Sequence, residues 1–307
     1  MTGPVQDQRL RAAARVLRHR MVRRIVAGGG LTDPAWRAAF AEVPRHLFVP
    51  VYYRGAFGDA GHGRYAADDP DPRRRLRWLT GAYCDQPIAT HVAHGELVSS
   101  SSQPSLMALM CQALDVREGQ RVLEIGAGTG YNAALLAHRL GGTGAVTTVD
   151  LDAEITAAAR EHLAAYGTAE ALSVTVVTGD GALGHPPGAP YDRVVATCEL
   201  PSIPPAWTAQ CRPGARILAP FATGLVLLTV RGPGRAEGRF LSTPAYFVPL
   251  RGRGAGIGPP AVGGEPSLLD RRPARTRFGL SVEGRRQWMW LDRPDGPDTW
   301  PVPAASG

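Results

Sequence analysis

The chain has 307 residues, 44% of them hydrophobic, so it can bury a sizeable core in one large domain or two smaller ones. The longest apolar window, residues 217–230, is interrupted by Pro220 and Gly224 and is too short for a membrane span. Residues 1–17 carry arginines and alanines where a signal peptide would have an apolar centre. The 4 cysteines form no CxxC pair, which favours reduced thiols over a disulfide framework or a zinc site. We therefore expect a soluble, cytoplasmic protein with no membrane contact and no metal.

The formal charge of +7 comes from arginine alone, because the chain contains no lysine. Of the 34 arginines, 15 lie in residues 1–80, against 7 of the 27 acidic residues. A basic segment of this kind could contact nucleic acid or an acidic peptide. However, the arginines between residues 9 and 24 recur at helical spacing among Ala, Leu and Val, which favours a solvated helix face. The compact run at 73–77 lacks interleaved aromatic residues, so no nucleic-acid partner is expected.

The N-terminal part of the chain is predicted to be helical. Residues 7–48 show helical periodicity, interrupted by a glycine-rich turn. A second helix is expected to begin at Pro34, with Thr32 or Asp33 as its N-cap. Residues 51–95 look rich in loops.

Beyond residue 120, short apolar strands alternate with helices. Helical periodicity covers residues 131–140 and 153–167. Continuous apolar strands separated by helices are typical of a parallel sheet that is covered on both faces. Strands are expected at residues 121–125, 145–150, 174–180, 191–197, 215–220 and 225–230.

The C-terminal part reads differently. An antiparallel strand is expected within residues 240–250, because no crossover helix fits between it and the preceding strand. Residues 251–266 have the Gly- and Pro-rich composition of a linker, and residues 277–295 alternate like a β-hairpin. We divide the chain into an N-terminal helical and loop region (1–95), a central α/β core (96–250), and a linker with a short C-terminal extension (251–307).

A glycine-rich loop follows the first predicted core strand directly. Gly126, Gly128 and Gly130 allow a tight turn and close approach of the backbone to a ligand at a helix N-terminus. A dinucleotide site prefers G-x-G-x-x-G, but Tyr131 occupies the final position here. The shorter G-x-G-x-G spacing, with Glu124 just ahead of it, is typical of proteins that bind S-adenosyl-L-methionine (SAM).

Two further acids follow successive predicted strands. Asp150 ends the second strand, where a carboxylate can accept both hydroxyls of a ribose, a feature shared with NAD sites. Asp180, in the Gly179–Gly181 turn, can lie beside an adenine amino group. Open α/β sheets bind ligands at the C-terminal ends of their strands. The glycine loop, Asp150 and Asp180 follow successive strands in this order, which favours SAM as cofactor.

Six segments of the chain occur in a specific order: VPRHLFVP, SQPSLMALM, VLEIGAGTGYNAALLA, GDGALGHPPGAPYDRVVAT, IPPAW with PGARILAP, and FVPL. Over residues 30–250 this combination resembles the protein-L-isoaspartate O-methyltransferase family. The resemblance implies an α/β fold of the class I SAM-dependent (Rossmann-like) type, a doubly wound and mostly parallel sheet with an N-terminal helical region and a C-terminal extension. It also implies methyl transfer from SAM to the α-carboxylate of L-isoaspartyl residues in proteins or peptides.

The resemblance also implies site residues. Ser102 matches the catalytic serine of the family, Ser100 replaces a threonine hydroxyl, and Ser101 replaces an apolar isoleucine. Residues 1–95 are implied to form part of the substrate site. The implied cofactor-binding residues are Ser101, Met107, Glu124, Gly126, Ala127, Gly128, Thr129, Gly130, Asp150, Leu151, Asp180 and Gly181.

The chemistry suits hydroxyl groups. A substrate carboxylate, with a pKa of about 4, is already ionised at neutral pH and needs no general base. Ser100 and Ser102 can donate hydrogen bonds that orient it. Arg45 and His46 could contact a carboxylate, or they could serve only to join the N-terminal helices to the sheet.

Two departures from the family pattern leave alternatives open. The segment before the serines carries extra residues, and the chain extends about fifty residues past the usual end. Both features are similar to a branch that methylates an ordinary aspartate in ATP-grasp or lanthipeptide precursor peptides, giving aspartimide or isoaspartate. A third hypothesis is a non-catalytic SAM-binding protein that binds a partner through its basic N-terminal region; the intact glycine loop and acids argue against it. The sequence does not indicate an oligomeric state.

Overall fold

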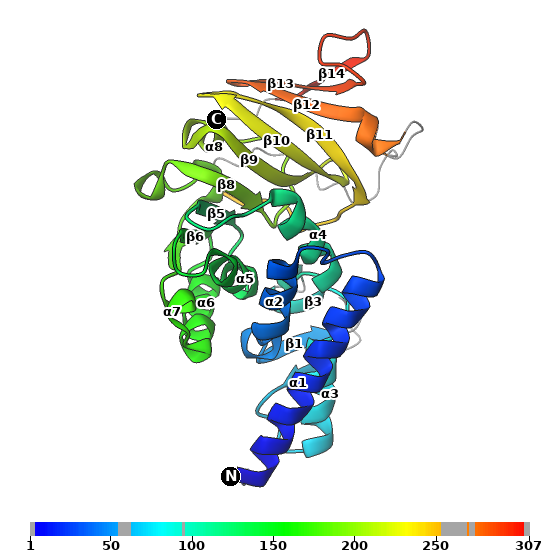
Figure 1. The fold of residues 1–307 in the computed structure, drawn as a ribbon, viewed down its shortest axis with the longest axis vertical. Helices are drawn as coiled ribbons and strands as arrows, with labels where there is room; N and C mark the ends of the chain where they lie inside the picture. The colour runs from blue at the N-terminus through cyan, green and yellow to red at the C-terminus, as the bar shows by residue number, and fades with distance from the viewer. Residues whose placement is uncertain (1–3, 55–62, 94–95, 253–268, 270–273, 304–307) are drawn as a thin grey trace.

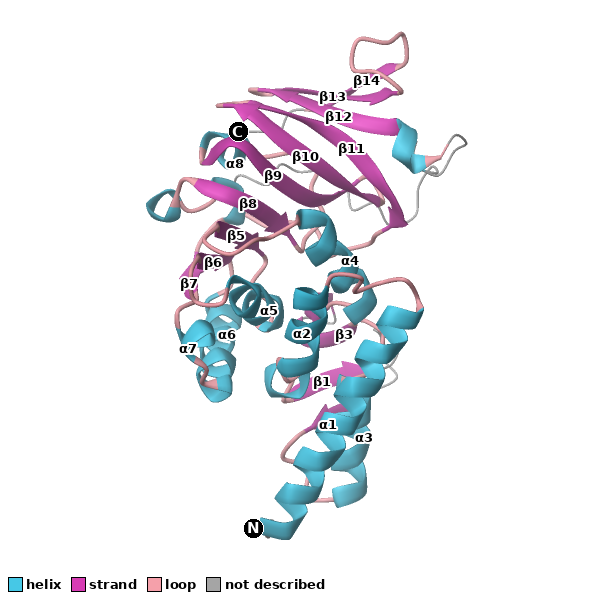
Figure 2. Cartoon of the chain, in the orientation of Figure 1, coloured by secondary structure: helices cyan, strands magenta, loops and turns pink. Residues whose placement is uncertain are grey.

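A computed structural model describes residues 4–54, 63–93, 96–252, 269 and 274–303. In this part of the chain the strands form two sheets, one of 10 strands and one of 4 strands (Figures 1 and 2). The larger sheet has the order β14-β13-β12-β11-β10-β9-β8-β5-β6-β7, and the smaller has the order β2-β1-β3-β4. The N-terminal helices and the smaller sheet lie at one end of the molecule, and the last strands lie at the other.

One half of the large sheet is parallel. It consists of β5 (Arg121–Ile125), β6 (Ala145–Asp150), β7 (Thr175–Thr178), β8 (Tyr191–Ala196) and β9 (Cys211–Phe221). The five predicted strands of this half are confirmed, and the bounds of β5 and β6 agree with the prediction residue by residue. Because β6 and β8 pair on opposite sides of β5, the strand order reverses there, which creates a crevice at the C-terminal end of β5.

The other half is antiparallel. It consists of β10 (Gly224–Gly232), β11 (Arg235–Pro244), β12 (Phe278–Glu283), β13 (Arg286–Leu291) and β14 (Thr299–Val302). The predicted hairpin is confirmed as β12 and β13, and β12 pairs with β11, so the C-terminal strands continue the core sheet. Most of the predicted linker, from residue 253 onward, lies outside the described residues, and the three-part division of the chain stays a prediction.

The predicted antiparallel strand within residues 240–250 needs a correction. The strand ends at Pro244, and residues 245–250 leave the sheet. Glu199 N donates to Val248 O at 2.9 Å, and Leu250 N donates to Glu199 O at 2.8 Å. These bonds hold the segment across the end of β8 instead of along β10.

Helices cover the two faces of the large sheet unequally. On one face lie α4 (Pro104–Leu114), α5 (Tyr131–Leu140), α6 (Ala153–Tyr166) and α7 (Ala169–Leu172), whose buried side chains share a core with Val122, Val146 and Val195. On the other face, α8 (Pro205–Ala209) inserts the fully buried Trp207 into a core with Leu123, Ile125 and Val194. Alternation of side chains along each strand accounts for the two separate cores.

The N-terminal helices are α1 (Pro4–Ala27) and α2 (Pro34–Glu42), followed by the 3-10 turn η1 (Arg45–Phe48). Of the two predicted N-cap candidates, Asp33 caps α2: its side chain accepts from Ala35 N at 2.7 Å, with Pro34 in the first turn. Within the described ranges, we find no helix both long and apolar enough to cross a membrane.

The expectation of loops over residues 51–95 is wrong. This region contains β1 (Val51–Arg54), β2 (Gly63–Ala66), α3 (Pro72–Ala82) and β3 (Ile88–Ala93), and β4 (Glu96–Ser101) completes the small sheet. The sheet is stabilised by contacts between distant residues, such as the stacked rings of Tyr52 and Tyr65 with centroids 5.2 Å apart. A strand of four residues carries too short a pattern to be recognised locally. The first three of the four consecutive serines thus form the end of strand β4.

Candidate active site

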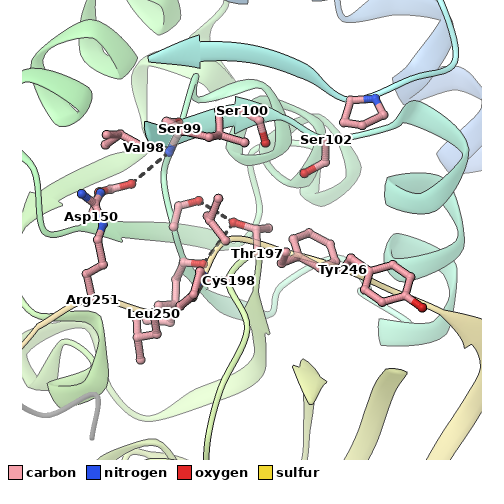
Figure 3. A pocket seen from close by; sticks show the side chains of 18 of the residues that line it. Val98, Ser99, Ser100, Ser102, Asp150, Thr197, Cys198, Tyr246, Leu250 and Arg251 are labelled. Atoms are coloured by element: carbon pink, nitrogen blue, oxygen red, sulfur yellow. Dashed lines mark hydrogen bonds between the residues drawn. The ribbon is translucent and has the colours of Figure 1, made fainter. Parts of the chain in front are cut away.

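A cavity of about 610 Å³ opens at the crevice beside β5 (Figure 3). The ends of β5, β6 and β8 form its floor, β4 and the start of α4 form one wall, and the segment 244–251 forms another. Its lining includes Ser99, Ser100, Ser102, Ile125, Gly126, Gly128, Asp150, Leu151, Gly181, Thr197, Cys198, Tyr246, Leu250 and Arg251.

The glycine loop brings backbone to the cavity surface. Gly126 has φ +94° and Gly128 has φ +50°, both in the region that favours glycine. A Cβ atom on Gly126 would lie 2.5 Å from the Thr197 hydroxyl. Thr197 Oγ1 donates to the carbonyl oxygens of Gly126 at 2.9 Å and Ile125 at 3.2 Å. The loop is thus held against the end of β8, and only glycine fits at its first position.

Asp150 lies where β6 ends. Its carboxylate accepts from Gly128 N at 3.2 Å through Oδ2 and from Asp152 N at 3.3 Å through Oδ1. These two bonds leave lone pairs on both oxygens, because a carboxylate can accept about four hydrogen bonds. The next residue, Leu151, also lines the cavity and is 42% exposed, so an apolar surface adjoins the carboxylate.

Glu124 lies behind the loop and is fully buried. Asn132 Nδ2 donates to its Oε1 and Thr148 Oγ1 donates to its Oε2, each at 2.6 Å. Burial raises the pKa of Glu124 to about 7 in spite of these two hydrogen bonds, and the charge of Asp150 adds to the rise. Glu124 therefore connects β5, β6 and α5 beneath the loop and does not line the cavity.

Three serines of the β4 wall face the cavity, and the fourth does not. Ser99, Ser100 and Ser102 line it, and Figure 3 shows Ser100 and Ser102 along the wall across from Thr197 and Tyr246. Ser101 is only 4% exposed, and its Oγ accepts from Arg45 Nη2 at 3.1 Å. Ser101 thus points to the opposite side of the strand from Ser100, as successive side chains of a strand do.

Arg45 contacts the wall from behind, and His46 packs beside Tyr83. Arg45 is fully buried and donates to the carbonyl oxygens of Ser101 at 3.2 Å and Ser102 at 3.1 Å. His46 Nδ1 lies 2.7 Å from the Tyr83 hydroxyl, and burial lowers the pKa of His46 to about 4. Neither side chain lines the cavity, so direct contact with a bound carboxylate, one of the two roles considered from the sequence, does not fit this geometry.

Comparison with known sequences identifies the family. A sequence profile described as protein-L-isoaspartate(D-aspartate) O-methyltransferase (PCMT) matches residues 74–253. The chain belongs to the PCMT family. Protein-L-isoaspartate O-methyltransferase 1 of Anaeromyxobacter sp. is 39% identical over 234 residues, which cover 75% of this chain and 93% of that protein. Protein-L-isoaspartate O-methyltransferase 1 of Archaeoglobus fulgidus is 34% identical, covering 70% of this chain and 84% of that protein.

Solved structures of PCMT proteins share the fold. One protein-L-isoaspartate O-methyltransferase superposes with a TM-score of 0.61 at 22% identity and covers 94% of this chain and 88% of its own. A putative PCMT from Plasmodium falciparum, solved in complex with S-adenosyl-L-homocysteine, has a TM-score of 0.57 at 14% identity and covers 75% of this chain and 96% of its own. The predicted family and fold class are confirmed. The family is one of O-methyltransferases, so the predicted enzyme class is confirmed as well.

The cavity of this PCMT protein brings together only part of the predicted site. Of the predicted residues, Ser100, Ser102, Gly126, Gly128, Asp150, Leu151 and Gly181 line it. The lining does not include Ser101, Met107, Glu124, Ala127, Thr129, Gly130 and Asp180. Met107 is on the buried face of α4, and Gly130 is the N-cap of α5. Asp180 accepts from Ala182 N at 2.9 Å, beside Gly181 in the lining. Direct cofactor contact by these seven residues stays a prediction.

Several lining residues have no counterpart in the sequence prediction. Thr197 and Cys198 follow β8 directly, at the same edge of the sheet as Gly126 and Asp150, so their position could have suggested them. Burial raises the pKa of the Cys198 thiol, which therefore stays protonated at neutral pH. Tyr246 and Arg251 reach the cavity only because their segment crosses the end of β8. No local sequence pattern marks that crossing.

Metal ligands are absent from the part of the chain that the structure describes: it contains no group of three His, Cys, Asp or Glu side chains that could hold a metal ion. All four cysteines are free thiols.

Proposed function

We propose that this protein transfers a methyl group from SAM to the α-carboxylate of L-isoaspartyl residues in protein or peptide substrates. The observation that carries the proposal is the cavity itself. At one end it exposes the glycine loop and Asp150, and at the other the hydroxyls of Ser100 and Ser102. One compartment can therefore hold a nucleoside cofactor and a carboxylate substrate together.

The loop end fits SAM. The positive φ of Gly126 and the space occupied by the Thr197 hydroxyl leave backbone, without a side chain, facing the cavity. Asp150 has acceptor capacity for ribose hydroxyls, and Leu151 and Ile125 offer apolar surface for a purine ring. When bound, SAM supplies an electrophilic methyl group on a sulfonium sulfur.

The serine end fits a carboxylate. Ser100 and Ser102 can each donate one hydrogen bond and thereby fix the direction of a carboxylate oxygen toward the loop end. Asp150 is the one acidic residue in the described lining, and it belongs to the loop end, so no carboxylate competes with the substrate beside the serines. The new O–CH3 bond forms while the S–CH3 bond breaks, and no proton has to move, because the nucleophile is already an anion.

The first test is transfer of labelled methyl from SAM to two matched peptides that carry L-isoaspartate or L-aspartate at one position. Base-labile incorporation into the isoaspartyl peptide is the expected result. Preference for the aspartyl peptide would instead support tailoring of ordinary aspartates. SAM binding without transfer to either peptide would support the non-catalytic hypothesis.

Two variants test the roles of the two ends of the cavity separately. Ser102→Ala should lower kcat/KM for the peptide about tenfold, the cost of one hydrogen bond to a charged group, and leave affinity for S-adenosyl-L-homocysteine unchanged. Asp150→Ala should weaken cofactor affinity by a similar factor. If Ser102→Ala methylates normally, the role assigned to this hydroxyl is wrong.

The C-terminal extension alone does not favour methylation of ordinary aspartates in precursor peptides over methylation of isoaspartyl residues. A solved protein-L-isoaspartate O-methyltransferase covers 94% of this chain in superposition, so its fold extends over most of the C-terminal strands as well. The C-terminal extension is therefore not a structural mark of a different substrate, and the peptide pair decides the question.

A further inference from the structure

Arg45 is a buried cation behind the serine wall. Its side chain is fully buried, and its two terminal nitrogens donate to the carbonyl oxygens of Ala82, Cys84, Ser101 and Ser102 and to the Ser101 hydroxyl, at 2.7–3.3 Å. All five acceptors are neutral. Burial lowers the pKa of the guanidinium, but arginine remains protonated in proteins. A full positive charge therefore lies behind the segment whose Ser102 side chain lines the cavity.

Its neighbours do not neutralise this charge. None of the ion pairs among the described residues involves Arg45. The carboxylate that contributes to its electrostatics is Asp85, which accepts from Ser105 N at 2.8 Å. The Tyr131 ring lies 6.0 Å from the guanidinium, at the outer limit of a cation–π contact. Burying a charge without a counter-ion is costly, so an anion that arrived nearby would be strongly favoured.

The position of the charge relative to the cavity is fixed by two bonds. Arg45 Nη2 lies 3.1 Å from Ser102 O, and the Ser102 side chain lines the cavity. The same nitrogen lies 3.1 Å from the hydroxyl of Ser101, which faces away from the cavity. The strand backbone thus separates the cation from any ligand at the serine end, and the separation prevents direct contact.

We propose that Arg45 is a positioning residue that attracts the substrate carboxylate through the serine wall and holds Ser102 in place. The inference rests on the proposed function. A cation in direct contact would share electron density with the carboxylate and make it a poorer nucleophile. A cation behind the strand gives electrostatic attraction in a low-dielectric setting and leaves the attacking oxygen to the weaker serine hydroxyls.

The test compares binding of two peptides in the presence of S-adenosyl-L-homocysteine: the isoaspartyl peptide and the same peptide with a neutral α-carboxamide. The dissociation constant of the carboxamide peptide divided by that of the isoaspartyl peptide measures the preference of the site for a charged carboxylate. Arg45→Met should lower this ratio at least tenfold, whereas Arg45→Lys, which keeps the charge, should retain most of it and lose mainly kcat. A merely structural role would change both peptides equally. An unchanged ratio in Arg45→Met, or equal loss in both variants, overturns the proposal.

Arg193→Met is the matched control, because Arg193 is also buried and donates to the Asp115 carbonyl away from the cavity. It should leave the ratio unchanged. The peptide ratio is a binding measurement, whereas the proposed function is judged on methyl transfer by the unmodified protein. The role of Arg45 and the proposed function can therefore be disproved independently of each other.

A second pair of variants keeps the test decisive if Arg45→Met does not fold. Ser101→Asp would place a carboxylate against Arg45 and neutralise it, and Ser101→Asn has nearly the same shape without charge. The ratio should fall about tenfold further in Ser101→Asp than in Ser101→Asn. Equal ratios in the two variants overturn the proposal. If Arg45 only held the structure together, an ion pair with Asp at position 101 would hold it as well as the Ser101 hydroxyl does, and charge preference would not change.

Discussion

The hydroxyl of Thr197 donates to the carbonyl oxygen of Gly126 at 2.9 Å and occupies the space that a Cβ on Gly126 would need. This contact joins the end of β8 to the glycine loop. Thr197→Val keeps the shape and removes both hydrogen bonds, so the loop should lose about 1 kcal/mol of support. We expect the dissociation constant for S-adenosyl-L-homocysteine, measured by calorimetry, to rise about fivefold. Thr197→Ser keeps the donor and should bind normally; equal weakening in both variants would contradict the assignment.

Gly126→Ala should be more severe. The new methyl group would lie 2.5 Å from the Thr197 hydroxyl, and alanine is strained at φ +94°. We expect cofactor affinity to fall more than tenfold. Gly119→Ala is the matched control: Gly119 has φ +76° but open space around its Cβ position. The control carries backbone strain without the clash, so a comparable loss of cofactor affinity there would show that the clash is not the cause.

Glu124 should make stability depend on pH. Its pKa is raised from 4.5 to about 7 by burial, so the folded state binds more protons than the unfolded state between these values. The free energy of unfolding should therefore fall as pH rises through this window, by an amount on the order of 3 kcal/mol from this group. Glu124→Gln cannot ionise and should gain stability relative to the unmodified protein between pH 5 and pH 8.

The measurement for Glu124 is urea unfolding at several pH values. Glu118→Gln is the control, because Glu118 is exposed and its substitution removes one acidic group without changing the core. Parallel pH profiles for Glu124→Gln and the unmodified protein would show that Glu124 is ionised throughout at little cost.

Local pattern was sufficient for the centre of the fold. β5 and β6 were predicted with correct bounds because buried parallel strands are continuous apolar runs, here followed directly by Gly126 and ended by Asp150. The same two residues were predicted for the site from their places at the ends of these strands, and both line the cavity. Ser100 and Ser102 also line it, but they were predicted from the family resemblance and not from local pattern.

Long-range pairing accounts for what the sequence did not reveal. β1 and β3 meet through the pair Tyr53 and Ala89, and such a pairing leaves no local signal. Residues 245–250 reach the cavity through hydrogen bonds to Glu199, about fifty positions earlier. The family resemblance implied that Ser101 contacts the cofactor, whereas its hydroxyl accepts from Arg45 and does not line the cavity.

Gln287 shows that the C-terminal strands are part of the core. It is 5% exposed, accepts from Ile203 N at 2.8 Å and donates to Ile203 O at 2.7 Å. Gln287→Leu would leave two buried backbone groups unpaired, at about 1–3 kcal/mol each. We expect Tm to fall by about 5–10 °C in one cooperative transition. Arg285→Leu, in the exposed turn between β12 and β13, should change Tm little. A separate early transition in Gln287→Leu would instead mean that residues 278–302 unfold as an independent unit.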